Sequence, residues 1–272
     1  TMSVTAEDIR SAATALQGHI IRTPMLAAPM LSRQFGCDLF VKLECQQYTS
    51  SFKARGAYIA MQSLNAAQRK AGVIAMSAGN HAQAVAYHAE RMGIPAVIVM
   101  PAQTPFAKVA RTRAYGAEVV LEGRNLNECE GTVNALIDER GLTLIHPYDN
   151  ALVMTGQGTV GLEMLEDEPD LDMLVVPIGG GGLIGGIATI AREMRPNIKI
   201  IGVQTEAYPT MQLAIAGKEI ECGGETLAEG IAVKKPGNVT RPVVAQHVDD
   251  IILVSERQLE WAVGALVEQQ RV

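Results

Sequence analysis

Short apolar runs alternate with helical patterns along almost the whole chain. The runs predict strands at Leu39–Leu43, Val73–Met76, Ala96–Met100, Glu118–Leu121, Leu142–Ile145, Met173–Pro177, Ile198–Gln204 and Ile251–Val254. Helical spacing predicts helices at His81–Met92, Pro105–Tyr115, Leu126–Arg140, Met154–Glu166, Leu183–Met194 and Glu256–Glu268. This alternation is typical of βαβ units and mainly parallel sheets. Runs rich in Val, Ile and Leu favour strands buried on both faces.

The length and composition allow more than one core. The chain has 272 residues, of which 48% are hydrophobic, and this suffices for one large core or two smaller ones. It contains no linker rich in Pro, Gly and Ser, no internal repeat and no low-complexity segment. A chain with two domains must therefore pass between them by short crossings.

Charge and cysteine usage narrow the class of protein. A net charge of -6 without a long basic run argues against nucleic acid and anionic membranes as partners. No apolar stretch reaches the length of a membrane span, and no signal peptide is present. Cys37, Cys45, Cys129 and Cys222 form no CxxC pair, which argues against a zinc site or a disulfide framework. Reduced thiols in a cytoplasmic protein are the expectation.

Four consecutive glycines, Gly179–Gly182, separate a predicted strand from a predicted helix. Such glycines let the backbone turn tightly and point several N–H groups at one place, and the helix adds its positive dipole end. A flexible turn is the alternative, but the flanking strand and apolar helix favour a phosphate-binding loop. No Gly-Lys-Ser/Thr follows, and the spaced glycines and later acidic residue of a dinucleotide site are missing.

A second strand-to-helix turn, SAGNHA at residues 77–82, follows the predicted strand Val73–Met76. Its N–H groups suit an anion such as a carboxylate, and the Asn80 amide can donate to a ring oxygen. A capping turn, with Ser77 or Asn80 as N-cap, fits the same residues equally well. A lone histidine such as His81 is more often structural than catalytic.

The stretch SFKARGA places Lys53 at a predicted helix start, with Ser50 or Ser51 as N-cap. A positive charge is unfavourable at the positive end of a helix dipole. Lys53 therefore either points to solvent or has a role that requires it to be less charged. A lysine amine, a phosphate-binding loop and a turn for a small anion are together what pyridoxal-phosphate chemistry needs.

From about Ile9 to its C-terminus the sequence resembles the threonine dehydratase and serine racemase group of fold-type II pyridoxal-phosphate enzymes, most of all threonine dehydratase. SFKARGA resembles the family's lysine motif, SAGNHAQA its carboxylate loop and PIGGGGLIGG its phosphate loop, while Glu225–Val233 resembles a further segment near the cofactor. The resemblance implies two mainly parallel-sheet α/β domains, as in tryptophan synthase β, with the cofactor between them. Residues 1–53 and 149–272 are then the large cofactor-binding domain, and residues 54–148 the small domain.

The resemblance also implies the roles of individual residues toward pyridoxal 5'-phosphate. Lys53 holds the cofactor covalently and, when released by substrate, removes the α-proton, which requires a lowered pKa. Phe52 lies beside the ring, and Asn80 binds the ring hydroxyl. The cofactor phosphate is held at Gly179, Gly180, Gly181, Gly182 and Leu183, and Gly230 is a further cofactor-binding residue. The substrate carboxylate is held at Ser77, Ala78, Gly79, Asn80 and His81.

The activity implied is a β-elimination by a threonine/serine ammonia-lyase (dehydratase), which converts L-threonine or L-serine into a 2-oxo acid and ammonia. The family is commonly homo-oligomeric, so a cytoplasmic dimer or tetramer that acts on a small amino acid is expected. Serine racemase, 3-hydroxyaspartate dehydratase and a non-catalytic protein that binds cofactor or amino acid are the alternatives.

Three departures from the family's pattern lead to further expectations. Two-base racemases of the group carry serine where this chain has Ala78, so little racemisation is expected. Members with a divalent-metal site carry carboxylates where this chain has Gln204 and Thr210, so no metal site is expected, although Glu206 is near. Family members continue beyond the point that matches Val272 and there supply the partner of the pyridine nitrogen. A C-terminally shortened form with weak cofactor binding is therefore expected.

Overall fold

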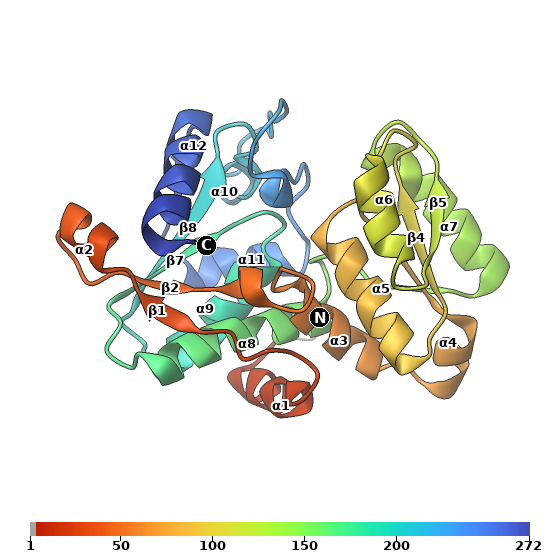
Figure 1. The fold of residues 1–272 in the computed structure, drawn as a ribbon, viewed down its shortest axis with the longest axis horizontal. Coiled ribbons are helices and arrows are strands. Elements are labelled where there is room, and N and C mark those ends of the chain that lie inside the picture. The colour runs from red at the N-terminus through yellow and green to blue at the C-terminus, as the bar shows by residue number, and fades with distance from the viewer. Residues whose placement is uncertain (1–3) are drawn as a thin grey trace.

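The computed structural model describes residues 4–272, which form two parallel sheets and one hairpin (Figure 1). The first sheet has four strands in the order β5-β4-β3-β6, and the second has three in the order β7-β8-β9. The strands are β3 (Val73–Met76), β4 (Ala96–Met100), β5 (Glu118–Leu121), β6 (Thr143–Leu144), β7 (Met173–Pro177), β8 (Lys199–Thr205) and β9 (Asp250–Val254). The hairpin pairs β1 (Met25–Ala27) with β2 (Phe40–Lys42) in antiparallel fashion.

The four-stranded sheet is covered on both faces. Helices α5 (Asn80–Met92) and α6 (Phe106–Arg113) contribute to one core cluster, and α7 (Leu126–Arg140) contributes to another. Ile98 faces the first cluster, whereas its neighbours Val97 and Val99 face the second. Alternate residues of β4 thus enter opposite cores, which explains its continuous apolar sequence. The short helix α4 (Ala66–Ala71) precedes β3.

In the three-stranded sheet, the outer strand β7 is buried on one face only, whereas the central strand β8 is buried on both. The helices of this part are α1 (Ala6–Leu16), α2 (Pro29–Phe35), α8 (Ala151–Asp167), α9 (Gly182–Met194), α10 (Thr210–Ile215), α11 (Thr240–His247) and α12 (Glu256–Ala265). Leu174 and Val176 of β7 pack into a core with α9 and α11, but Met173 and Val175 are 47% and 57% exposed. Two-sided burial was therefore a wrong prediction for β7, because the core cluster lies on one side only.

Helix α3 (Lys53–Gln62) lies between the two parts of the molecule (Figure 1). It crosses α8 so closely that a Cβ on Gly56 would lie 2.4 Å from Gln157 Nε2. The N–H of Gly56 donates to Gln157 Oε1 at 3.0 Å, and His88 Nε2 of α5 lies 2.9 Å from the Ala54 carbonyl oxygen. This helix is therefore fixed from both sides, and Lys53 is its first residue.

The predicted strands and helices agree with the structure, apart from their ends and the N-terminal hairpin. The run Leu39–Leu43 forms β2, but in the hairpin with the unpredicted β1 rather than in a parallel sheet. The helix predicted at Glu256–Glu268 is α12, which continues as a π-helical turn at Leu266–Gln270. Within residues 4–272, no helix combines the length and apolarity needed to cross a membrane. The domain boundaries remain a prediction.

Candidate active site

Lys53 is the N1 residue of α3, but the predicted cap is wrong. The N-cap residue is Phe52, with φ −54° and ψ −17°, and no side chain caps it. Ser50 has a left-handed φ of 57°, so it cannot take the extended conformation of an N-cap. Ser51 instead accepts a hydrogen bond from the N–H of Lys53 at 3.3 Å.

The Lys53 amine is directed to a backbone carbonyl rather than to a carboxylate. Its Nζ donates to the Pro147 carbonyl oxygen at 2.6 Å and lies 5.3 Å from the centroid of the Phe52 ring. Desolvation lowers the pKa of Lys53 to about 8. An amine with this pKa is partly free at neutral pH and can act as a nucleophile or as a base.

The glycine loop after β7 presents a set of unused donors. None of the backbone N–H groups of residues 179–183 donates a hydrogen bond to another group of the described chain. Gly180, Gly181 and Gly182 are buried, and Gly181 has a φ of 94° that favours glycine. Buried N–H groups without an acceptor are costly, so a loop of this kind is suited to an anion at the start of α9.

The position of the glycine loop is fixed from outside. The Thr240 hydroxyl donates to the Gly180 carbonyl oxygen at 2.5 Å. A Cβ on Gly180 would lie 2.1 Å from the Tyr148 ring, and one on Gly179 would lie 3.4 Å from the Gly230 carbonyl oxygen. Gly230 itself is exposed, and a Cβ there would meet nothing within 4 Å. The predicted residue Gly230 is thus beside the loop but has room for a side chain.

The second loop, residues 77–82, has free donors as well. The N–H of Gly79 donates to Ser77 Oγ at 3.2 Å, whereas the N–H groups of Ala78 and of residues 80–82 find no acceptor within residues 4–272. The N-cap of α5 is Gly79, so neither Ser77 nor Asn80 is its cap. Asn80 is exposed. A loop with open N–H groups at a helix start suits a carboxylate.

His81 is a buried histidine with one unused nitrogen. Its Nε2 lies 2.7 Å from the Ile145 carbonyl oxygen, and its Nδ1 is buried without a partner among the described residues. A carbonyl only accepts, so Nε2 carries the proton and Nδ1 is a free acceptor. Burial, followed by the charge of Lys53, lowers the pKa of His81 to about 3. His81 is therefore neutral at physiological pH.

The connection from β6 to α8, residues 145–150, joins these features. Its carbonyl groups at Ile145 and Pro147 accept from His81 and Lys53, and its Tyr148 ring lies against Gly180. The segment thus brings the lysine, the second loop and the glycine loop together. Sequence analysis missed it, although a run of His, Pro, Tyr, Asp and Asn between a strand and a helix was a usable signal.

Local hydrogen bonds hold this connection in shape. His146 Nδ1 accepts from the N–H of Tyr148 at 3.2 Å and from that of Asp149 at 2.8 Å. The Tyr148 hydroxyl donates to the Lys235 carbonyl oxygen at 2.8 Å, and burial raises the pKa of Tyr148 to about 12. Asn150 caps α8 through the N–H groups of residues 152 and 153.

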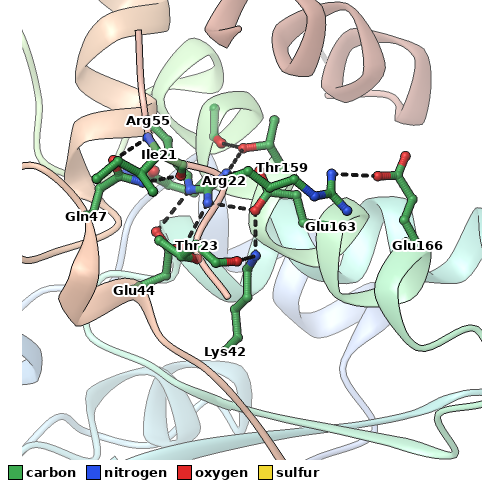
Figure 2. Close-up of polar contacts among 12 residues, drawn as sticks. Ile21, Arg22, Thr23, Lys42, Glu44, Gln47, Arg55, Thr159, Glu163 and Glu166 are labelled. Atoms are coloured by element: carbon green, nitrogen blue, oxygen red, sulfur yellow. Dashed lines mark hydrogen bonds and ion pairs between the residues drawn. The ribbon is translucent and has the colours of Figure 1, made fainter. Parts of the chain in front are cut away.

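A buried network of charges anchors the helix that Lys53 begins (Figure 2). The Arg55 guanidinium, which is fully buried, donates to Glu44 Oε1 and Glu163 Oε1, both at 2.7 Å. Lys42 Nζ donates to Glu163 Oε2 at 2.6 Å, so two cations face two carboxylates. Burial alone would raise the pKa of Glu163, but the hydrogen bond and charge of Arg55 lower it. The network joins α3 to α8 and to the segment after β2, and sequence analysis did not identify it.

Gln204 and Thr210, the positions at which no metal-binding carboxylate was noted in the sequence, have structural roles. Gln204 Oε1 accepts from the N–H groups of Met211 and Gln212 at 3.1 and 3.0 Å, and its Nε2 donates to the Ile178 carbonyl oxygen at 3.3 Å. The Thr210 hydroxyl donates to the Val233 carbonyl oxygen at 2.9 Å. Residues 4–272 contain no group of three His, Cys, Asp or Glu side chains placed for a metal ion.

The comparison with protein families decides the family. The model for pyridoxal-phosphate dependent enzymes matches residues 16–272. The chain belongs to this family. Its cofactor is pyridoxal phosphate, and its fold is that of the fold-type II enzymes. Lys53, with an amine of lowered pKa, and the free N–H groups of the glycine loop fit this cofactor's aldehyde and phosphate.

Individual relatives are similar over almost all of the chain. L-Threonine ammonia-lyase of Thermotoga maritima is 43% identical over 271 residues, which cover 99% of this chain and 68% of that protein. The maize serine racemase structure gives a TM-score of 0.95 at 35% identity and covers 100% of this chain and 83% of that one. A T.th. threonine deaminase structure gives 0.92 at 37% identity, with 98% and 87% covered. The chain spans about two thirds of the length of the curated ammonia-lyases of Thermotoga maritima and Geobacter sulfurreducens (68% and 66%).

Alanine at Gly180 is expected to weaken cofactor binding strongly, because its Cβ would lie 2.1 Å from the Tyr148 ring. Either the Tyr148 ring or the glycine loop must shift, and the N–H groups of the loop then no longer point at one place. We expect pyridoxal phosphate affinity, measured by visible absorbance titration, to fall by about tenfold or more. Gly131→Ala is the control, since Gly131 is an exposed residue of α7 whose Cβ would meet nothing within 4 Å, and it should bind normally. Equal affinities of the two variants would show that the loop does not hold the phosphate.

Proposed function

We propose that this protein is a pyridoxal-phosphate-dependent ammonia-lyase that converts L-threonine or L-serine into a 2-oxo acid and ammonia. The observation that carries the proposal is that residues 145–150 contact the Lys53 amine and both loops with unused N–H groups. Relatives named L-threonine ammonia-lyase and L-threonine dehydratase, each 43% identical, support the same activity. The β-hydroxyl leaves the substrate as water, and the enamine that results takes up one water through its imine form and so releases ammonia and the 2-oxo acid.

Lys53 is proposed to act twice, at the same atom. Its Nζ holds the cofactor in the resting protein and, once substrate has taken its place, removes the proton from the substrate α-carbon. Its pKa of about 8 suits both tasks, because the amine is accessible as a free base near neutral pH. When bound, pyridoxal phosphate supplies an electron-accepting ring that delocalises the charge left on the α-carbon.

The two loops are proposed to hold the two anionic groups. The N–H groups of residues 179–183 bind the cofactor phosphate, aided by the dipole of α9. The N–H groups of Ala78 and residues 80–82 bind the substrate carboxylate at the start of α5. The exposed Asn80 amide is free to donate to the ring hydroxyl, and Phe52 packs beside Lys53.

A substrate panel tests the proposal. Purified protein with pyridoxal phosphate is incubated separately with L-threonine, L-serine and 3-hydroxyaspartate. The 2-oxo acid and the ammonia are both measured, and elimination should give them in equal amounts. We expect product from threonine or serine. A protein that binds the cofactor and the amino acid but forms no 2-oxo acid from any of the three is a binding protein, and this result overturns the proposal.

Racemisation is expected to be minor, because Ala78 has no group that can give or take a proton. The residue stands in the loop proposed for the substrate carboxylate, where a hydroxyl could serve the face of the α-carbon opposite Lys53. We expect chiral chromatography after incubation with L-serine to find far less D-serine than 2-oxo acid. Formation of D-serine at a rate similar to elimination contradicts this prediction, and an Ala78→Ser variant shows whether a hydroxyl there raises it.

We also propose that the chain works as a cytoplasmic homo-oligomer. Leu26, Met30, Phe35 and Trp261 are 47%, 55%, 53% and 50% exposed, and the rings of Phe35 and Trp261 lie 6.1 Å apart. Exposed apolar side chains gathered in one place favour a protein contact. The four cysteines are free thiols, as suits a reducing compartment. Sedimentation velocity tests the assembly, and a monomer at all concentrations contradicts it.

A further inference from the structure

A cavity of about 360 Å³ lies at the far end of α3 from Lys53. Its lining includes His19, Tyr58, Gln62, Arg69, His88 and Arg91, and no acidic residue. We propose that this cavity is a second anion site, which binds a small organic phosphate ester. It shares no residue with the lysine and glycine-loop site. Its size is at the lower end of small-molecule pockets and exceeds what a bare phosphate ion needs.

The two arginines of the cavity supply positive charge that the protein does not neutralise. Arg69 donates through Nε to the Leu64 carbonyl oxygen at 3.0 Å and through Nη2 to that of Gln62 at 2.9 Å. The Arg91 guanidinium lies 5.4 Å from the centroid of the Tyr87 ring. Neither arginine forms an ion pair within residues 4–272. The Arg69 guanidinium is therefore held in place with a donor to spare, and the exposed Arg91 guanidinium has its donors available for phosphate recognition.

Two buried polar side chains complete the lining. His88 and Tyr58 are only 1% and 6% exposed. His88 Nε2 lies 2.9 Å from the Ala54 carbonyl oxygen and donates to it, because a carbonyl only accepts. His88 Nδ1 is therefore an acceptor, and it has no partner in the described chain. The Tyr58 hydroxyl likewise has no partner there, and the Tyr58 ring stacks on His19 with centroids 4.4 Å apart. The arginines and the phenol suit a phosphate, and the stacked rings suit an organic substituent.

The cavity is linked to the candidate active site through α3, which carries Tyr58 and Gln62, and through a hydrogen bond of His88. His88 lines the cavity and also contacts the carbonyl of Ala54, the residue after Lys53. Tyr58, whose hydroxyl can donate to a phosphate oxygen, is itself a residue of α3, so a bound ligand acts on the helix that Lys53 begins. We therefore expect a ligand in the cavity to change the affinity of the protein for pyridoxal phosphate. Bound pyridoxal phosphate must then change the affinity for that ligand by the same factor.

Calorimetry with a simple aromatic phosphate tests the proposal. Protein loaded with stoichiometric pyridoxal phosphate and freed of excess is titrated with phenyl phosphate, inorganic phosphate and phenol, while the visible spectrum reports whether the cofactor stays bound. We expect phenyl phosphate to bind, inorganic phosphate to bind more weakly and phenol not to bind. Arg69→Gln and Arg91→Gln should each weaken phenyl phosphate by about tenfold, which corresponds to one lost charge-assisted contact.

Arg111→Gln is the matched control, because Arg111 is an exposed arginine of α6 that is likewise in no ion pair among the described residues and is not part of the cavity. It should bind phenyl phosphate as the parent protein does. Equal loss in all three variants, equal binding in all of them, or no phenyl phosphate binding at millimolar concentration overturns the proposal. Since binding rather than turnover is measured, the outcome is independent of the proposed activity.

Discussion

Replacing Lys53 by alanine is expected to lower 2-oxo acid formation by about 10³-fold or more, because one atom is proposed both to hold the cofactor and to move the α-proton. The Lys53 amine is held at this position by the Pro147 carbonyl oxygen at 2.6 Å, and alanine has no amine to take its place. The measurement is single-turnover and steady-state formation of 2-oxo acid with saturating pyridoxal phosphate. The fold should persist, because alanine at this helix start removes a charge that the helix dipole opposes.

Lys70→Ala is the control for this experiment, because Lys70 is an exposed lysine of α4. It should retain full activity. If Lys53→Ala, at the same cofactor occupancy, retained activity within tenfold of the parent protein, Lys53 would have no essential part in the mechanism.

The pH dependence of stability provides a further prediction for Lys53. Desolvation lowers its pKa from 10.5 in the unfolded chain to about 8 in the folded one. Below pH 8 the amine is charged in both states, and its burial destabilises the fold. As the pH rises above about 8, the folded state loses the proton and this cost is relieved. Lys53→Met should therefore stabilise the cofactor-free protein more at pH 7 than at pH 10, as measured by urea unfolding. An equal effect at both pH values contradicts the lowered pKa.

Replacing Arg55 by methionine is expected to cost about 3–5 kcal/mol of unfolding free energy, since removal of one partner leaves buried charge unpaired. Glu163, which is 8% exposed, would then keep Lys42, whereas Glu44, which is 13% exposed, would lose the one cation paired with it among the described residues. The change also frees the first turn of α3, so cofactor affinity should fall together with stability. Urea unfolding and cofactor titration measure the two effects.

A surface ion pair provides the matched control for Arg55. Arg140 pairs with Glu118 at 2.8 Å, but the two side chains are 40% and 50% exposed. Arg140→Met should cost less than about 1 kcal/mol and leave cofactor affinity unchanged. If the two arginine variants lost similar stability, the network of Figure 2 would have no special part in fixing α3.

Local patterns were sufficient for most of the fold and for the loops of the site. The runs Val73–Met76 and Met173–Pro177 became strands with the predicted bounds, because short apolar runs bounded by turn residues favour buried strands. The glycine loop was found because a strand and a helix flank it. The resemblance to a known family, rather than any spacing, connected Lys53 with that loop.

The remaining features depend on contacts between distant parts of the chain. Arg55 meets Glu163 across a helix crossing that two glycines permit, and no local pattern shows which carboxylate a buried arginine will reach. The connection at residues 145–150 is important through its carbonyl groups, which every residue possesses. The exposed outer face of β7 reflects which helices cover the sheet, and this is a property of the assembled fold.

Peptide mapping after borohydride reduction tests most directly whether Lys53 is the cofactor lysine. The protein is loaded with pyridoxal phosphate, reduced, digested and analysed by mass spectrometry for the phosphopyridoxyl group. We expect the group on the peptide that carries Lys53, at about one per chain, and no comparable label on Lys42, which is paired with Glu163. A label on Lys42 or on another lysine, with Lys53 unmodified, would contradict the assignment of the active site.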